Sequence, residues 1–84
     1  MNINRINLID YAFQPIVNIH TGVTVAFEAL IRNVDKLGFG SIGEFFDYLY
    51  ERKILFKTEI ILRKKVLNKF KRFEDYKKYR IFTT

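Results

Sequence analysis

The residues best suited to chemistry are Glu28 and Arg32, which lie four positions apart in a run rich in β-branched and aromatic residues. If this run is an extended strand, side chains of equal parity share a face, so the carboxylate and the guanidinium point the same way with Leu30 between them. At ~3.3 Å per residue they lie roughly 13 Å apart, which is too far for a direct salt bridge. The spacing favours two separate tasks on one ligand, such as binding a metal ion and a phosphate group.

A β-hairpin over residues 11–32 must position these side chains. The segments Tyr11–Ile19 and Val23–Ile31 have strand-like composition and are separated by a short turn. Gly22 can supply the positive φ that such a turn often needs. Pro15 has no N–H for the ladder, so the first strand should have a gap or an edge there. His20, the single histidine, lies in the turn, where a structural or solvated role is favoured over catalysis or metal binding.

The hairpin sequence resembles the opening of the EAL domain family. The matching residues are Gln14-Pro15-Ile16-Val17, then Thr21-Gly22, then Glu28-Ala29-Leu30-Ile31-Arg32. A bare Glu-Ala-Leu occurs everywhere by chance, whereas this combination at this spacing is specific. The family comprises bacterial phosphodiesterases of the signalling dinucleotide cyclic di-GMP. The resemblance implies an α/β fold, the N-terminal fragment of a TIM-type (β/α)₈ barrel with the order β-hairpin, helix, helix, strand.

The resemblance also implies roles for four residues. Glu28 matches the family's metal-ligand glutamate, and Arg32 matches the arginine that holds a substrate phosphate. Gln14 and Leu30 match residues that line the substrate groove. The implied cofactor of the intact domain is Mg²⁺ or Mn²⁺, and the implied ligand is cyclic di-GMP.

The sequence does not supply a complete catalytic site. A barrel of this type needs about 250 residues, whereas this sequence has 84. One carboxylate cannot fix Mg²⁺ or Mn²⁺ in octahedral geometry. The family's other ligands lie in later strands, and Thr83 and Thr84 stand where the family carries a metal-binding asparagine. We therefore expect these residues alone to be catalytically inactive and to bind no metal.

Composition narrows the class of protein. The hydrophobic share of 49% and the aromatic share of 17% are typical of a globular chain. The absence of cysteine excludes a disulfide framework and a zinc–thiolate site. No apolar run approaches the ~20 residues of a membrane span, and no signal-peptide pattern is present. A cytoplasmic location is therefore expected.

The net charge of +6 is unevenly distributed. Residues 1–51 carry three basic and six acidic groups, a net charge of −3, whereas residues 52–84 carry twelve basic and three acidic groups, a net charge of +9. Such asymmetry can indicate an anionic partner, but a solvated basic helix face is the simpler interpretation. A nucleic-acid partner is not favoured, because no helix-turn-helix or RNA-binding sheet signature is present.

Two segments are predicted to lack regular structure. Residues 1–10 contain three asparagines, which disfavour a stable helix, so a loop or frayed lead-in is expected. Residues 33–43 are predicted to form a loop. Their Gly38-x-Gly40-x-x-Gly43 pattern matches the dinucleotide fingerprint by letter, but no strand runs directly into it, so we interpret the match as coincidence.

Two helices and a strand should follow. Ser41 and Glu44 form a capping box that predicts a helix over 41–53. A second helix is predicted over 54–75, and residues 79–84 should begin a strand. The apolar face expected for the second helix consists of Phe56, Ile60, Leu62, Val66, Leu67, Phe70 and Phe73, with Ile61 off that face. Glu59 and Arg63, one turn apart, are expected to form a boundary ion pair.

Two interpretations of function remain open: part of a phosphodiesterase domain, or a non-catalytic EAL-derived module for nucleotide sensing or protein interaction. In both, three strands cut from a barrel leave unpaired edges. Apolar side chains on one strand face should also be uncovered, namely Val23, Val25, Phe27 and Ile31. We therefore expect self-association into a homodimer.

Overall fold

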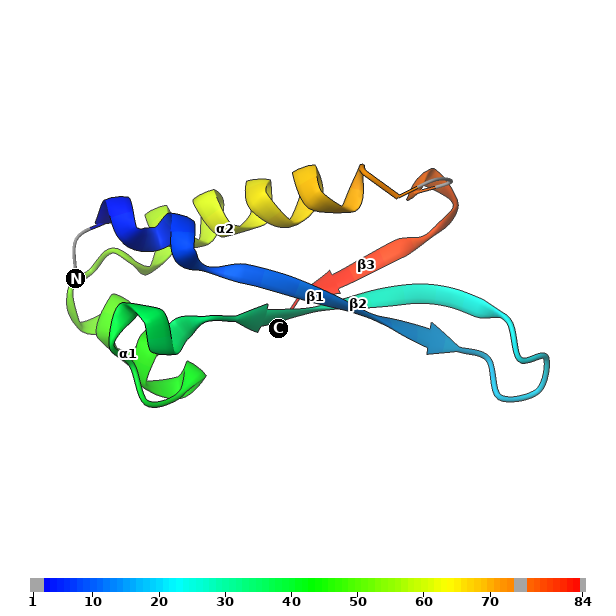
Figure 1. The fold of residues 1–84 in the computed structure, drawn as a ribbon, viewed down its shortest axis with the longest axis horizontal. Coiled ribbons are helices and arrows are strands. Elements are labelled where there is room, and N and C mark those ends of the chain that lie inside the picture. Colours follow the sequence, from blue (N-terminus) through cyan, green and yellow to red (C-terminus); the bar gives the residue numbers. More distant parts are fainter. Residues whose placement is uncertain (1–2, 74–75, 84) are drawn as a thin grey trace.

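The computed structural model describes residues 3–73 and 76–83 and folds them into a three-stranded sheet with two α-helices (Figure 1). The strands are β1 (Asp10–Val17), β2 (Thr24–Arg32) and β3 (Arg80–Thr83), in the spatial order β1-β2-β3. β1 and β2 pair antiparallel, and β3 pairs parallel with β2. The helices α1 (Ile42–Glu51) and α2 (Leu55–Phe70) form the crossover between β2 and β3. The predicted mixed α/β class and element order are confirmed, and the barrel stays a prediction.

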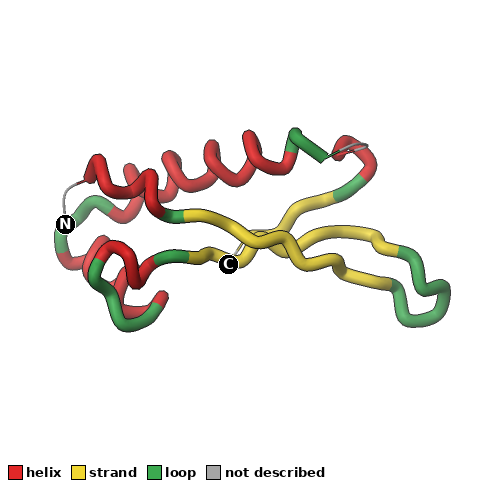
Figure 2. Tube along the Cα trace, viewed as in Figure 1, coloured by secondary structure: helices red, strands yellow, loops and turns green. Residues whose placement is uncertain are grey.

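A turn joins β1 to β2 (Figure 2). Hydrogen bonds to Asn18 hold it together. The Asn18 Oδ1 accepts hydrogen bonds from the N–H groups of His20 (2.8 Å) and Thr21 (3.3 Å). Gly22 has the expected positive φ of 69° and donates its N–H to the Asn18 carbonyl at 2.8 Å. This turn takes residues 18–23, so β1 ends at Val17 and not at residue 19 as predicted. Pro15 lies on β1, an outer strand of the sheet, which fits the expected edge.

Helix α2 covers one face of the sheet (Figure 1). The centroid of its Phe70 ring lies 5.5 Å from the ring centroid of Phe13 on β1 and 5.8 Å from that of Phe27 on β2. Ile31, on the same face as Phe27, is only 3% exposed. The expectation that Phe27 and Ile31 would be uncovered is therefore wrong, because α2 packs against that face. Val23 and Val25 are exposed as expected.

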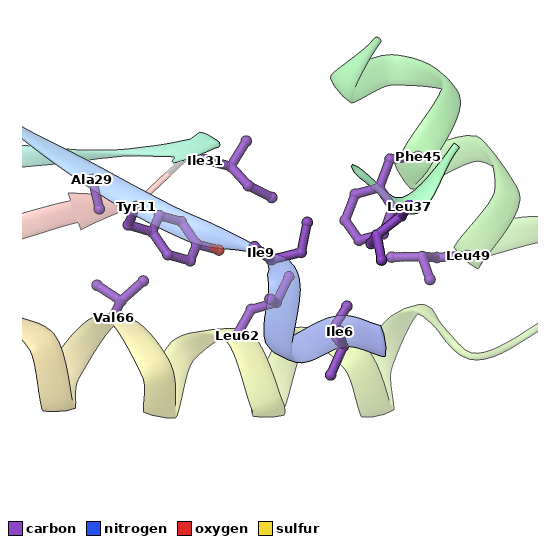
Figure 3. Close-up of a cluster of buried hydrophobic side chains, with 10 residues drawn as sticks. All are labelled: Ile6, Ile9, Tyr11, Ala29, Ile31, Leu37, Phe45, Leu49, Leu62 and Val66. Carbon is purple, nitrogen blue, oxygen red and sulfur yellow. The ribbon is translucent and has the colours of Figure 1, made fainter. Parts of the chain in front are cut away.

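The lead-in is part of the core and not a loop. Residues Ile3–Leu8 form a 3₁₀ helix, and Ile6 and Ile9 are buried (Figure 3). They pack in a cluster with the other buried side chains Tyr11, Ala29, Ile31, Leu37, Phe45, Leu49, Leu62 and Val66. Burial of two isoleucines, each worth about 1.5–3 kcal/mol, outweighs the weak helix propensity of the asparagines.

The segment 33–43 is also more ordered than a loop. Val34–Leu37 form a second 3₁₀ helix, whose Leu37 side chain is buried in the same cluster. Asn33 (φ 72°) and Gly38 (φ 92°) flank it in left-handed conformations that these two residue types tolerate. The prediction missed this turn because four residues are too few to show helical periodicity.

The predicted Ser41 N-cap of α1 is confirmed, whereas the Glu44 carboxylate bonds the N–H of Gly40 and not that of Ser41. The Ser41 hydroxyl accepts the Glu44 N–H at 3.1 Å, and the Glu44 carboxylate accepts the Gly40 N–H at 2.8 Å. An added Cβ at Gly40 would come within 3.1 Å of that carboxylate. Gly40 therefore serves helix capping, which agrees with the interpretation of the glycine pattern as a coincidence.

A Schellman motif ends α1 and separates the two helices. The Ile54 N–H donates to the Leu49 carbonyl and the Lys53 N–H to the Tyr50 carbonyl, both at 3.0 Å. Lys53 has a φ of 59°, a left-handed conformation that glycine usually takes at this position of the motif. No glycine marks this stop, so the sequence left the break between the helices undefined.

We expect Lys53→Gly to raise the free energy of unfolding by roughly 1 kcal/mol, because glycine adopts positive φ without the Cβ clash that lysine suffers. The matched control is Lys64→Gly, at an exposed position inside α2. It should lower stability by roughly 0.5–1 kcal/mol, since glycine is costly in a helix interior. Urea denaturation followed by circular dichroism measures both changes. Equal destabilisation by the two substitutions would contradict the assignment of the Lys53 conformation.

The apolar face of α2 matches the prediction in part, because Leu62, Val66 and Phe70 are buried as expected. The buried residues repeat every fourth position, namely Thr58, Leu62, Val66 and Phe70. Phe56, Ile60 and Leu67, all expected on the apolar face, are 77%, 42% and 48% exposed, and Ile61 instead packs against the core. The helix ends at Phe70 and not at 75, and the predicted last residues, 74–75, lie outside the described residues.

Thr58 is fully buried, and its Oγ1 has no hydrogen-bond partner among the described residues. A buried hydroxyl without a partner costs about 1–3 kcal/mol. We expect Thr58→Val, which replaces the hydroxyl with a methyl group of similar shape, to raise the free energy of unfolding by about 1 kcal/mol. Thr58→Ser keeps the hydroxyl, removes the methyl group and should destabilise the protein. Chemical denaturation distinguishes these outcomes, and a destabilised Thr58→Val would show that the hydroxyl is satisfied.

Candidate functional site

The register of the hairpin places Gln14 directly opposite Glu28, so their side chains share one face of the sheet. Directly opposed side chains in an antiparallel pair have Cβ atoms about 4.5–5.5 Å apart. On the other side of β2, Glu28 is paired with Phe82 of β3. Two of the predicted site residues are therefore neighbours, although they are fourteen positions apart in the sequence.

Leu30 and Arg32 follow Glu28 at alternate positions of β2 and therefore lie on the same face. This face points away from α2, which packs against the opposite side through Phe13, Phe27 and Ile31. We call it the distal face, and its residues are Ala12, Gln14, Ile16, Ala26, Glu28, Leu30, Arg32, Arg80 and Phe82. Asp10 is paired with Arg32 in the register, but its carboxylate is bonded to Lys69 of α2. All four residues assigned from the sequence thus share one surface.

The side chains of Glu28 and Arg32 on the distal face can still form bonds to a ligand. Glu28 is half-buried, and its carboxylate has no hydrogen-bond or ion-pair partner in the described part of the chain. Arg32 is exposed, and one guanidinium nitrogen donates to the Ile31 carbonyl at 3.0 Å. A guanidinium carries five N–H donors, so Arg32 can still bind a phosphate in a bidentate manner.

The residues of the distal face do not by themselves fit a Mg²⁺ or Mn²⁺ ion. Glu28 offers one carboxylate and Gln14 one amide oxygen, whereas Mg²⁺ requires near-octahedral oxygen coordination. Across residues 3–73 and 76–83, no three histidine, aspartate or glutamate side chains are grouped so that they could hold a metal. Thr83 pairs with Ala29 and so belongs to the α2 side, and Thr84 lies outside the described residues.

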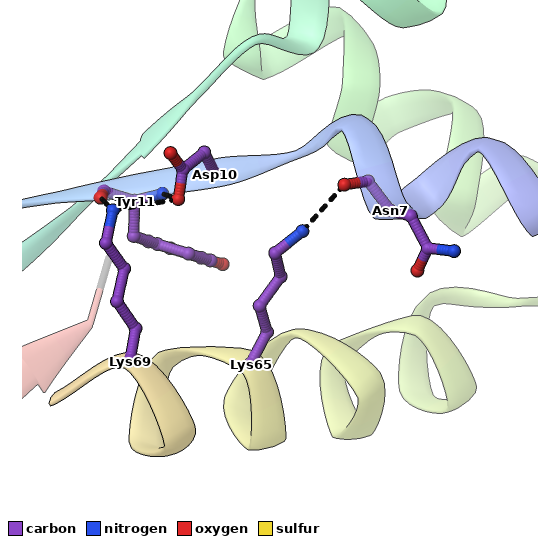
Figure 4. Close-up of polar contacts among 5 residues, drawn as sticks. All are labelled: Asn7, Asp10, Tyr11, Lys65 and Lys69. Carbon is purple, nitrogen blue, oxygen red and sulfur yellow. Dashed lines mark hydrogen bonds and ion pairs between the residues drawn. The ribbon is translucent and has the colours of Figure 1, made fainter. Parts of the chain in front are cut away.

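Two lysines of α2 serve structure rather than a ligand (Figure 4). Lys69 Nζ donates to the Asp10 carboxylate at 2.9 Å and to the Tyr11 carbonyl. Lys65 Nζ donates to the Asn7 carbonyl at 2.8 Å. The hydrogen bond from Lys69 holds the pKa of Asp10 below its usual value. The sequence gives no local signal for the Lys69–Asp10 ion pair, because the two residues lie almost sixty positions apart.

The lysine contacts explain part of the charge asymmetry. Two of the basic residues in 52–84, Lys65 and Lys69, bond α2 to the N-terminal segment. These contacts support a structural interpretation of part of the positive charge. His20 is exposed in the hairpin turn, away from the distal face, as expected for a solvated side chain. No helix in the described ranges is long and apolar enough to cross a membrane.

A scan against protein-family models, a search of curated proteins and a search of solved structures each found no match to this chain.

Proposed function

We propose that this chain is part of an EAL-type domain that binds and hydrolyses cyclic di-GMP in the cytoplasm. The proposal rests on the combined Gln-Pro-Ile-Val, Thr-Gly and Glu-Ala-Leu-x-Arg spacing. The observation that carries it is the register, which places Gln14 opposite Glu28 and puts Leu30 and Arg32 on the same distal face. Alternation along β2 already puts Glu28, Leu30 and Arg32 on one face. The support that the register adds is the position of Gln14, which comes from the other strand and lies opposite Glu28.

Each residue has a distinct role in this proposal. Arg32 binds a phosphate of the dinucleotide through charge-assisted hydrogen bonds. Gln14 offers a carboxamide for hydrogen bonds, and Leu30 provides apolar contact to the nucleotide. Glu28 contributes one oxygen ligand to a Mg²⁺ or Mn²⁺ ion whose other ligands come from outside the described residues. The described residues alone bind no metal and do not hydrolyse the substrate.

A non-catalytic module that senses the nucleotide or binds a partner is the second candidate. The observation that favours it is the single carboxylate that the register sets beside Gln14, because one carboxylate cannot organise a metal-dependent hydrolysis. In this case the distal face binds cyclic di-GMP through Arg32 and Gln14 without turnover.

The proposal is tested by titrating the ¹⁵N-labelled protein with cyclic di-GMP and following amide chemical shifts. We expect saturable shifts confined to β2 and the facing part of β1. Arg32→Ala should weaken binding by roughly 10- to 100-fold, because a charge-assisted contact is worth ~1.5–3 kcal/mol. The matched control is Arg72→Ala, an exposed arginine just after α2, which should leave affinity unchanged.

Two outcomes would count against these assignments. Equal loss of affinity in Arg32→Ala and Arg72→Ala would indicate non-specific attraction by positive charge. Turnover by the purified protein that is abolished in Glu28→Gln would show that these residues are catalytically competent, contrary to our expectation.

A further inference from the structure

A cavity of about 250 Å³ lies on the α2 side of the sheet, away from the distal face. Three apolar side chains line it, Phe46 of α1 and Leu62 and Val66 of α2. Four polar residues complete its wall, namely Tyr11 of β1, Glu59 and Arg63 of α2, and Thr83 of β3. An apolar wall with a few convergent polar groups is the usual composition of a small-molecule site.

Tyr11 has an unusual position in this wall. Only 7% of the residue is exposed, and Figure 3 shows its ring facing Leu62 and Val66 of α2. Its backbone N–H and carbonyl are bonded to Asp10 and Lys69, but its hydroxyl has no partner among the described residues. Burial raises the pKa of Tyr11 to about 12, so the hydroxyl is a neutral donor at pH 7. Tyr11 lines the cavity, and its hydroxyl oxygen is not among the buried polar atoms without a partner in the described residues, so it is accessible and available to a ligand.

Glu59 and Arg63 place opposite charges at the same cavity. They lie one turn apart on α2, a spacing at which Cβ atoms are about 5–6 Å apart and ion pairs commonly form. The ion pair expected from the sequence is not formed, and neither side chain bonds to any other described residue. Half-buried Glu59 and exposed Arg63 therefore both line the cavity with their charges unpaired among the described residues.

We propose that this cavity binds a free α-amino acid with an apolar side chain. The guanidinium of Arg63 and the hydroxyl of Tyr11 receive the carboxylate of the ligand, and the Glu59 carboxylate receives its ammonium group. The apolar side chain of the ligand lies against Phe46, Leu62 and Val66. The volume suits a ligand below drug size, for which a dissociation constant on the order of 1 mM is expected. This inference is independent of cyclic di-GMP binding on the distal face.

The experiment compares three probes of matched shape by isothermal titration calorimetry on the whole protein. L-leucine carries both charges, 4-methylpentanoate lacks the ammonium group, and 3-methylbutylamine lacks the carboxylate. We expect saturable binding of L-leucine and at least tenfold weaker binding of each analogue. Equal binding of the three probes, or no saturable binding of L-leucine, would overturn the proposal.

Substitutions assign the contacts. Arg63→Gln should abolish L-leucine binding, and Glu59→Gln should make L-leucine bind no better than 4-methylpentanoate. Tyr11→Phe removes only an unbonded hydroxyl, so it should keep the fold by circular dichroism and weaken L-leucine binding severalfold. The matched control, Lys57→Gln, changes an exposed charge of α2 outside the cavity wall and should not alter affinity. Unchanged affinity in both Arg63→Gln and Glu59→Gln would also refute the site.

Discussion

Replacing Phe45 with alanine is expected to lower the free energy of unfolding by about 3–5 kcal/mol, the usual cost of truncating a buried phenylalanine. Phe45 is fully buried, and its ring lies 5.3 Å from the rings of both Phe39 and Phe46. It joins α1 to the lead-in and the sheet, since Ile6 and Ile31 belong to the same buried cluster. A domain of this size has only about 5–15 kcal/mol of stability, so the variant should be substantially unfolded at moderate temperature.

The matched control for this substitution is Phe56→Ala. Phe56 has the same chemistry and also lies on a helix, but 77% of it is exposed. Its truncation should change the free energy of unfolding by no more than about 0.5 kcal/mol. Urea denaturation of both variants measures the difference. Comparable destabilisation by the two changes would mean that Phe56 is buried, as the sequence predicted, and not exposed.

The protein is expected to self-associate, with a mass of at least twice the 10.1 kDa of one chain. β1 and β3 are the outer strands, and no other strand in residues 3–73 and 76–83 pairs with their free edges. Unpaired edges are templates for another chain. On the distal face Ile16 is 38% and Phe82 is 52% exposed, so an apolar surface lies next to these edges. A second copy is the simplest partner that covers both features.

Light scattering at micromolar concentration measures this mass directly. Phe82→Lys, which puts a charge into the proposed interface, should shift the protein towards the monomer. Leu67→Lys, an equally exposed apolar position on the outer side of α2, is the matched control and should leave the mass unchanged. A monomeric mass for the unsubstituted protein, with a cooperative thermal transition, would refute self-association.

The hairpin and the capping box could be predicted from the sequence because their signals are local. Alternation of side chains, the positive φ of Gly22 and the Ser41–Glu44 pair each act within a few residues. The choice of Gln14, Glu28, Leu30 and Arg32 as one group also came from the sequence, through motif spacing. Strand parity alone required Glu28, Leu30 and Arg32 to share a face, whichever way the hairpin packed.

The tertiary structure decided which surfaces are buried. Helical periodicity predicted that Leu62, Val66 and Phe70 are buried, as observed. Only packing against the sheet excluded Phe56, Ile60 and Leu67 from the buried face. The lead-in became ordered because Ile6 and Ile9 fill the cluster around Phe45, a gain that outweighs weak local propensity. Three features depend on contacts between segments distant in the sequence. They are the pairing of Gln14 with Glu28, the Lys69–Asp10 ion pair and the cavity at Tyr11. Such contacts leave no local pattern, because their energy exists only once the segments have come together.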